Sequence, residues 1–146
     1  RQMCIRDRIA AIRGIPAGRD SISPNRHLEI ESIGDLLDFI DRVRTLTGKP
    51  TGFKTVVASF EWLDELCREV LRRGIESAPD FITLDSGDGG TGAAPMALID
   101  NVGLPIRESL PLVADILRLH GLKGRTRLIA SGKLVTPANV ALALFM

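Results

Sequence analysis

Three short apolar segments alternate with amphipathic helical patterns along most of this chain, and this alternation limits its fold more than any other feature. The segments are FKTVVAS at 53–59, DFITLDS at 80–86 and RLIAS at 127–131. Short and nearly continuous apolar strands that are separated by helices predict a parallel sheet covered by helices. The expected fold class is therefore α/β, either an open doubly wound sheet or part of a (β/α)8 barrel, which takes about 250 residues in full.

Boundary signals predict where the first and last helices begin. Ser32, with Asp35 three residues later, forms a short capping box, and Gly48 ends the helix that follows. Thr136 is the expected N-cap of the last helix, with Pro137 at its first position. The sequence therefore predicts the N-cap residue of the first helix and of the last helix.

Helical apolar stripes identify the faces that we expect to cover the sheet. After the first helix, a second ends at Gly74, and a third runs from about Arg107 to near Gly121. The stripe residues in chain order are Ile33, Leu36, Leu37, Ile40 and Val43, then Leu63, Leu66, Cys67, Val70 and Leu71, and then Leu110, Val113, Ala114 and Leu117.

Charge and cysteine content exclude several classes of protein. The 19 basic and 18 acidic residues leave a net charge of +1 and are scattered, so we expect no nucleic acid or anionic membrane as a partner. We find no apolar run of about 20 residues and no signal peptide, which predicts a cytoplasmic protein without membrane contact in this part. Cys4 and Cys67 lie far apart, which fits reduced thiols better than a disulfide or a metal site.

The loop at 85–95, DSGDGGTGAAP, contains the pattern G-x-G-x-x-G of dinucleotide-binding proteins at Gly87, Gly89 and Gly92. In that fold the loop runs directly into a helix, and an acidic residue follows at the tip of the next strand. Here Pro95 would fall inside the first turns of such a helix, where proline is unfavourable. The next strand ends in Ser131, which is not acidic. The context therefore argues against a dinucleotide site.

The same loop still has the chemistry of a binding loop. Four glycines lie within 87–92, which permits positive φ angles and close approach of backbone N–H groups to a ligand. Ser86 and Thr91 add hydroxyls, while Asp85 and Asp88 can accept hydrogen bonds from a ligand. A surface loop whose aspartates are only solvated is the alternative interpretation.

Two lysines near predicted strand ends are candidate binding residues. Lys54 lies in an otherwise apolar strand, where it either extends to water at the end of the sheet or places a cation beside a bound cofactor or substrate. Ser131, Gly132 and Lys133 leave the last strand just before a capped helix, which is a plausible phosphate cradle. In either architecture, ligands bind at the loops that follow the strands, which also include Ser59.

The two histidines show no metal-ligand spacing. His27 lies in the loop segment SPNRHLEI, where it could make a loop contact. His120 precedes the glycine that ends a helix, so we expect it to stabilise the helix C-terminus.

Five segments follow one another along the chain: SISPNRHLEIESIGDLLDFI, GKPTGFKTVV, DFITLDSGDGGTGAAP, GLPIRESLP and IASGKLVT. In this order they resemble the FMN-binding domain of glutamate synthase, and most closely the short proteins similar to that domain. The resemblance runs from about Ile9 to Met146. We therefore expect 1–8 to be a non-native or disordered leader and 9–146 to be part of a barrel domain, incomplete at both ends.

The resemblance implies a partial (β/α)8 TIM barrel that binds FMN at the carboxyl ends of its strands. The implied reaction is the reductive formation of L-glutamate from 2-oxoglutarate and glutamine-derived ammonia. It also implies an electron-donor subunit linked to NAD(P)H or ferredoxin, and a glutaminase domain or subunit. With this reaction, the protein would be an oxidoreductase of nitrogen assimilation.

The resemblance also implies roles for individual residues. Lys54 matches a lysine close to flavin and keto acid and is the expected catalytic residue. Pro24, Arg26 and His27 match a loop of the family whose individual roles stay open. The residues expected to bind the cofactor are Lys54, Ser86, Gly87, Asp88, Gly89, Gly90, Thr91, Ser131, Gly132 and Lys133.

Some family features have no counterpart in this sequence. A glycine-rich segment with a glutamate near the keto acid would precede Arg1, and the last barrel strand and the cysteines of an iron–sulfur cluster would follow Met146. Neither Cys4 nor Cys67 can replace those cysteines, and no glutaminase nucleophile is present. We therefore expect these residues alone to be poorly stable and inactive, and the intact protein to be a flavoenzyme.

Three alternatives to the glutamate synthase reaction stay open. One is a related flavoenzyme that acts on another 2-oxo acid or amine, such as an N-methylglutamate synthase component. Another is a flavin-binding subunit without catalysis of its own. The least specific is an unrelated phosphosugar-binding barrel.

Overall fold

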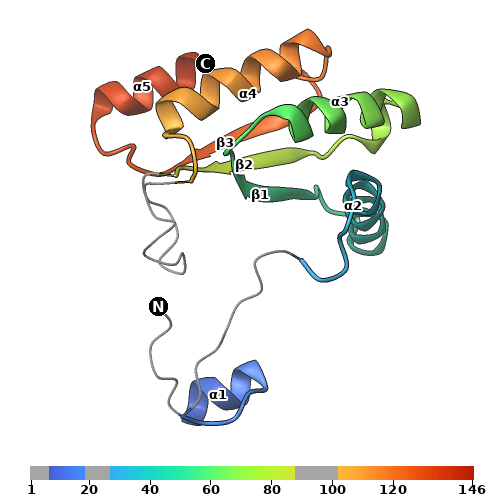
Figure 1. The fold of residues 1–146 in the computed structure, drawn as a ribbon, viewed down its shortest axis with the longest axis vertical. Helices are drawn as coiled ribbons and strands as arrows, with labels where there is room; N and C mark the ends of the chain where they lie inside the picture. Colours follow the sequence, from blue (N-terminus) through green and yellow to red (C-terminus); the bar gives the residue numbers. More distant parts are fainter. Residues whose placement is uncertain (1–6, 19–26, 88–101) are drawn as a thin grey trace.

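The computed structural model describes residues 7–18, 27–87 and 102–146, and these residues form an α/β structure around a three-stranded parallel sheet (Figure 1). The predicted α/β class is confirmed. The elements in chain order are α1 (Asp7–Arg13), α2 (Ile33–Thr47), β1 (Gly52–Val56), α3 (Glu61–Arg73), η1 (Ile75–Ser77), β2 (Phe81–Asp85), α4 (Ile106–Leu119), β3 (Arg127–Ser131) and α5 (Pro137–Phe145).

The strands lie side by side in the order in which they occur in the chain, β1-β2-β3, and both pairs are parallel. β3 has the predicted bounds, whereas β1 ends at Val56 and not at residue 59. At the carboxyl end of the sheet, Val56 lies opposite Asp85, and Asp85 lies opposite Ser131. The loops predicted to carry the chemistry therefore leave the sheet next to one another.

The two faces of the sheet differ. On one face, Ile82 and Leu84 are fully buried, and α3 and α4 lie over them, with α5 beside α4 (Figure 1). Because side chains alternate along a strand, the other face carries Lys54 of β1 and Ile129 of β3, both of which are exposed. We call this second face, defined by Lys54, Val56, Thr83, Asp85, Ile129 and Ser131, the open face.

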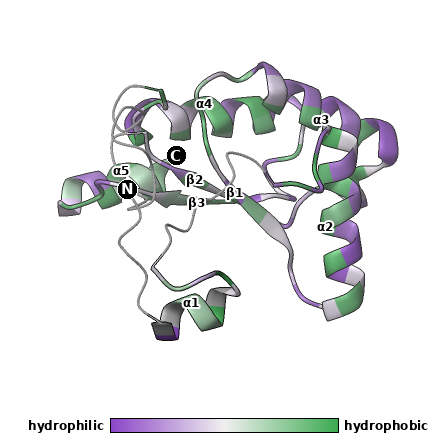
Figure 2. Cartoon of the chain, turned by 60° about the horizontal axis from the view of Figure 1, so that its bottom comes forward, coloured by the Kyte–Doolittle hydropathy of each residue, from purple (hydrophilic) through white to green (hydrophobic). Residues whose placement is uncertain are grey.

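The helical stripes form the core between the helices and the sheet. Figure 2 shows the hydrophobic side of α4 directed toward the sheet. One stripe assignment is wrong, because Leu71 is 49% exposed on the outer side of α3. The stripe residues of α3 and α4 that are buried as predicted are Leu63, Leu66, Cys67, Val70, Leu110, Val113, Ala114 and Leu117.

The predicted caps are confirmed. The backbone N–H of Asp35 donates to the Ser32 hydroxyl at 3.1 Å, and the Asp35 carboxylate accepts from the backbone N–H of Ser32 at 2.9 Å. Gly48 ends α2 in the left-handed conformation, with a φ of 62°. Thr136 caps α5 by accepting from the backbone N–H of Asn139. Local chemistry therefore sets both helix starts.

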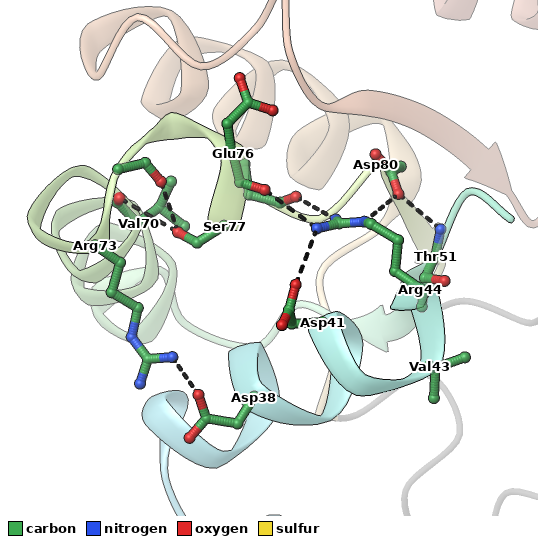
Figure 3. Close-up of polar contacts among 12 residues, drawn as sticks. Asp38, Asp41, Val43, Arg44, Thr51, Val70, Arg73, Glu76, Ser77 and Asp80 are labelled. Atoms are coloured by element: carbon green, nitrogen blue, oxygen red, sulfur yellow. Dashed lines mark hydrogen bonds and ion pairs between the residues drawn. The ribbon is translucent and has the colours of Figure 1, made fainter. Parts of the chain in front are cut away.

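At the amino end of the sheet, Asp80 joins three segments (Figure 3). One carboxylate oxygen accepts from Nε of Arg44 at 2.9 Å and from the backbone N–H of Thr51 at 2.8 Å. The other oxygen accepts from Arg125 at 2.8 Å. Desolvation acts to raise the pKa of Asp80, but the hydrogen bonds from Thr51, Arg125 and Arg44 outweigh it, so the pKa lies below its ordinary value. Asp80 thereby ties α2 and both outer strands to β2.

Candidate functional site

The opposite, carboxyl end of the sheet brings together an ion pair between neighbouring strands. Nζ of Lys54 donates to Oδ2 of Asp85 at 2.9 Å. The Lys54 side chain is 55% exposed, whereas that of Asp85 is 2% exposed. Lys54 therefore presents a half-exposed cation on the open face, as expected for a lysine that meets a bound anion or carbonyl oxygen.

Asp85 is incompletely paired. Its second oxygen, Oδ1, is buried and has no hydrogen-bond partner in the structure that the described residues form. A buried carboxylate oxygen without a partner is costly, on the order of 1–3 kcal/mol. The carboxyl end of β2 thus holds an unfavourable group, and such groups often mark functional sites.

Ser86 and Gly87 fix the start of the glycine loop. The buried Ser86 hydroxyl accepts from the backbone N–H of Ile106, the first residue of α4, at 3.1 Å. The backbone N–H of Ser86 donates to the carbonyl of Ser131 at 3.0 Å, and that of Gly87 donates to the carbonyl of Leu104 at 3.0 Å. The first two residues of the loop therefore connect β2 with β3 and with the start of α4.

A returning segment, Gly103-Leu104, crosses the ends of the first two strands. The backbone N–H of Leu104 donates to the carbonyl of Val57 at 2.7 Å. A Cβ atom on Gly87 would lie 2.2 Å from the carbonyl oxygen of Gly103, and a Cβ on Gly103 would lie 2.8 Å from Cα of Gly87. Both positions accept only glycine because two backbones meet there. The two ends of the glycine loop are thus held together at the sheet edge.

Gly103 was missed by the sequence analysis as a site residue, and Gly87 was interpreted only as a point of ligand approach. The structure assigns Gly87 a packing contact with Gly103, while its part in cofactor binding stays a prediction. The available signal was the isolated glycine of NVGLP, just before α4. Without knowledge of the loop closure, nothing in the sequence pairs it with Gly87.

The segment after β3 has an unusual backbone. Gly132 and Lys133 have φ angles of 110° and 43°, and Lys133 is the non-glycine residue with positive φ in the described part of the chain. The carbonyl of Lys133 accepts from the side-chain amide of Asn139 in α5 at 3.4 Å, and Asn139 also accepts from Arg107 of α4 at 2.6 Å. The segment Ser131-Gly132-Lys133 is therefore anchored to the first turns of both helices that begin at this end of the sheet.

Several predicted site residues lie outside the described residues. These are Asp88, Gly89, Gly90 and Thr91 of the glycine loop, and Pro24 and Arg26 of the earlier loop. Of the predicted residues that are described, Ser86 contacts Ser131 directly, Gly87 follows Ser86 in the chain, and Lys54 lies on the neighbouring strand β1. Their roles in binding stay predictions.

Two other candidates, His27 and Ser59, make local contacts. Nδ1 of His27 accepts from the backbone N–H of Glu29, and its ring lies 4.9 Å from that of Phe39. A hydrogen bond from Ser59 lowers the pKa of the neighbouring Glu61. None of these contacts involves Lys54 or the start of the glycine loop.

His120 is at the end of α4 as expected, but its side chain has another partner. Its backbone N–H completes the last turn, while Nε2 lies 2.7 Å from a carboxylate oxygen of Asp64 in α3. His120 is therefore at the helix end as expected, while its side chain connects α4 with α3.

Metal and membrane features are not found in the residues that the structure describes. No group of histidine, cysteine and acidic residues there could hold a metal ion. Cys67 is a free, buried thiol, and desolvation together with the nearby Asp64 raises its pKa to about 11. No helix among the described residues is long and apolar enough to cross a bilayer.

The fold and the site define an α/β protein with a parallel sheet, in which Lys54, Asp85, Ser86 and Ser131 come together at the carboxyl ends of the strands. In proteins of this class, that end of the sheet is where ligands bind. Comparison with known proteins identifies the family within this class. The chain matches the family described as a conserved region in glutamate synthase over residues 3–146, and it belongs to that family.

Individual relatives agree with the family match. The chain is 41% identical over 140 residues to the glutamate synthase large subunit-like protein YerD of Bacillus subtilis, which covers 96% of this chain and 26% of that protein. It is 33% identical over 138 residues to the archaeal-type glutamate synthase (NADPH) of Thermotoga neapolitana, covering 93% and 26% respectively. The glutamate synthase (NADPH) large chain of B. subtilis is 32% identical over 136 residues, with 92% of this chain and 9% of that protein covered. The chain therefore spans about a quarter or less of the length of these relatives.

Proposed function

We propose that this chain is part of an FMN-dependent oxidoreductase of glutamate synthase type. The observation that carries the proposal is the position of Lys54 and of the glycine loop. The Lys54 ammonium and the start of the glycine loop, Ser86-Gly87, lie at the carboxyl end of a parallel sheet, in a chain that belongs to the glutamate synthase family. Family relatives named as glutamate synthases support the class of reaction.

The sheet topology supports a barrel wall. Right-handed crossovers between strands in sequential order place every connecting helix on the same side of a sheet. A doubly wound sheet instead reverses its strand order and carries helices on both faces. Here the order is β1-β2-β3, and α3 and α4 cover one face (Figure 1). We therefore propose that the sheet is part of a (β/α)8 barrel and that its open face is directed toward the barrel interior.

The residues present fit an anionic, planar cofactor such as FMN. The Lys54 ammonium provides a positive charge on the open face, and the Gly132-Lys133 turn lies just before the N-terminus of α5, where phosphate groups are favoured. We propose that Lys54, Ser86–Thr91 and Ser131–Lys133 hold the cofactor, with Lys54 also close to the reacting centre. FMN, when bound, supplies hydride transfer.

The proposed reaction is the reductive formation of L-glutamate from 2-oxoglutarate and glutamine-derived ammonia. It requires an electron donor, linked to NAD(P)H or ferredoxin, and a glutaminase domain or subunit. An iron–sulfur cluster elsewhere in the full-length protein would fit the same electron transfer. A related reaction on another 2-oxo acid or amine, and flavin binding without catalysis, are the outcomes that would contradict this assignment.

The deciding experiment uses the full-length protein in which this sequence occurs. We expect bound flavin, seen by its absorbance, and formation of glutamate from 2-oxoglutarate with ammonia or glutamine and a reductant. Flavin without glutamate formation would show one of the two alternative roles. A protein without flavin would overturn the proposal.

Within the site, Lys54→Ala tests the role of the lysine. We expect loss of flavin-dependent turnover by about 100-fold or more, as for removal of a preorganised electrostatic group. Lys49→Ala, which removes an exposed lysine from the loop before β1, is the matched control and should leave turnover unchanged. Turnover of Lys54→Ala at the wild-type rate would mean that Lys54 only extends to solvent.

A further inference from the structure

Asp85 and Lys54 differ sharply in their freedom to move. The Asp85 carboxylate is almost fully enclosed, whereas more than half of the Lys54 side chain is exposed. A long, exposed lysine loses rotamer entropy when it is held in one place, and a buried carboxylate at the end of a strand has little to lose. The buried Asp85 carboxylate is therefore the fixed partner, and it holds the mobile Lys54 ammonium in position.

The register shows the direction in which Lys54 is held. Lys54 lies opposite Thr83 of β2, while Asp85 lies opposite Val56, two residues nearer to the carboxyl end. Two residues of a strand span about 6.6 Å. The ion pair at 2.9 Å therefore directs the Lys54 ammonium along the open face toward the loops that leave the strands. An unpaired lysine at this position would be free to extend elsewhere into solvent.

The pairing of Asp85 does not match that of an aspartate that serves stability. Asp80, five residues earlier, has hydrogen bonds to both carboxylate oxygens. Asp85 has one hydrogen bond to one oxygen, and Oδ1 is buried without a partner in the described structure. A carboxylate buried in this way costs stability, which makes a purely structural role a poor explanation for it.

We propose that Asp85 is a positioning residue, which acts through Lys54 by holding its ammonium at the carboxyl edge of the open face. The inference rests on the proposed function, because the value of a fixed ammonium depends on a ligand that binds there. Misplacement of a charged group by about 1 Å is enough to lower a rate by about 100-fold. Asp85 itself does not contact the reacting atoms in this proposal.

The test is a double-mutant cycle in the full-length protein, with Asp85→Asn, Lys54→Ala and the double variant. We expect Asp85→Asn to lower kcat by about 10- to 100-fold. We expect the double variant to be no slower than Lys54→Ala, because residues that act as a unit are not additive. Additive losses would show that Asp85 acts independently of Lys54 and would overturn the proposal.

Two controls separate positioning from structural damage. Asp80→Asn removes the carboxylate at the other end of the same strand, so we expect it to lower stability and to leave kcat per bound flavin unchanged. If Asp85→Asn does not fold, Asp85→Glu keeps the charge and displaces it. We expect this variant to bind flavin and to have a kcat between those of the wild type and Lys54→Ala. A kcat per bound flavin equal to the wild-type value in Asp85→Asn or Asp85→Glu would overturn the proposal.

The failure of the proposed function is a distinct result. A wild-type protein without flavin-dependent turnover would overturn the proposed function and this inference together. Flavin-dependent turnover by the wild type, together with additive losses of kcat in Asp85→Asn and Lys54→Ala, would overturn the inference alone.

Discussion

The two aspartates at the ends of β2 are in contrasting environments. Asp80 at the amino end accepts three hydrogen bonds, from Arg44, Thr51 and Arg125, and its side chain is 21% exposed. Asp85 at the carboxyl end is more deeply buried and accepts one hydrogen bond, from Lys54. One strand therefore joins a fully paired end to an incompletely paired end.

The contrast indicates that the amino end of the sheet serves stability and that the carboxyl end serves binding or catalysis. At the amino end, Arg44 of α2 and the backbone N–H of Thr51, just before β1, satisfy one oxygen of Asp80 (Figure 3). Arg125, before β3, satisfies the other oxygen, so the network stabilises the fold. At the carboxyl end, the Lys54 ammonium is half-exposed on the open face, and Oδ1 of Asp85 has no partner among the residues that the structure describes. Unpaired groups cost stability, so their place at the loop end of the sheet fits function better than folding.

The largest expected effect compares the two aspartates directly. Asp80→Asn should lower the local stability of the sheet by about 3 kcal/mol, because it removes the carboxylate that two partly buried arginines, Arg44 and Arg125, share. Asp85→Asn should change stability by less than about 1 kcal/mol, because the carboxylate it replaces is already incompletely paired. Hydrogen–deuterium exchange of peptides from β2 and β3 measures both. Equal losses of stability in Asp80→Asn and Asp85→Asn would contradict the contrast between the two aspartates.

A smaller effect is expected at the crossing of the two glycine segments. Gly103→Ala should cost about 2 kcal/mol and loosen the start of the glycine loop, because the added Cβ would lie 2.3 Å from a methyl of Val56 and 2.8 Å from Cα of Gly87. Gly124→Ala is the matched control, since no atom lies within 4 Å of its added Cβ. Thermal unfolding checks the pair, and equal melting temperatures would mean that the crossing adapts without cost.

Acid should weaken the network around Asp80 at the amino end of the sheet. The pKa of Asp80 is lowered in the folded protein, so its contribution to stability is present above its ordinary unfolded pKa of about 3.9 and is lost as the pH falls through the folded pKa. The slope from this group is at most about 1.4 kcal/mol per pH unit. A paired carboxylate loses its contribution to stability between about pH 5 and pH 1. The free energy of unfolding, measured between about pH 5 and pH 2, should therefore fall less steeply in Asp80→Asn than in the wild type. Parallel curves would contradict this role for Asp80.

The smallest effect concerns one hydroxyl at the amino end. Thr126 is fully buried, and its hydroxyl donates to the carbonyl of Pro79 at 2.9 Å. Thr126→Val should cost about 1 kcal/mol, because it leaves that carbonyl without its partner. Thr47→Val, at an exposed helix end, should cost less than about 0.5 kcal/mol. A larger loss for Thr47→Val in urea unfolding would show that burial at the amino end is not what makes the network stable.

Much of the local structure could be predicted from sequence because its causes are local. The Ser32–Asp35 capping box and the Thr136 cap depend on residues three positions apart, and both form as expected. The apolar stripe of α4 faces the sheet because helical periodicity sets its direction. Leu71 was misplaced for the same reason, since it borders the stripe of α3 and periodicity alone does not define the edge of a buried face.

The candidate site was only partly predictable. Lys54, Ser86 and Ser131 were identified as residues near strand ends, and the structure places them on three neighbouring segments. The pairing of Lys54 with Asp85 and the contact of Gly87 with Gly103 were not predicted. Both join residues that are far apart in the chain, and their partners depend on strand register and loop closure.

The α/β class, the helix caps and the family resemblance follow from the amino-acid sequence, because periodicity, capping chemistry and motif order are properties of residues close in the chain. Which face of the sheet is open, and which aspartate is fully paired, depends on how distant segments pack. Asp80 and Asp85 are the same residue type, but Asp80 directly precedes the five-residue strand β2 and Asp85 is its last residue. They differ because the packing of α2 and of the segments before β1 and β3 brings two arginines and a backbone N–H to Asp80, whereas the register of β1 with β2 brings Lys54 to Asp85.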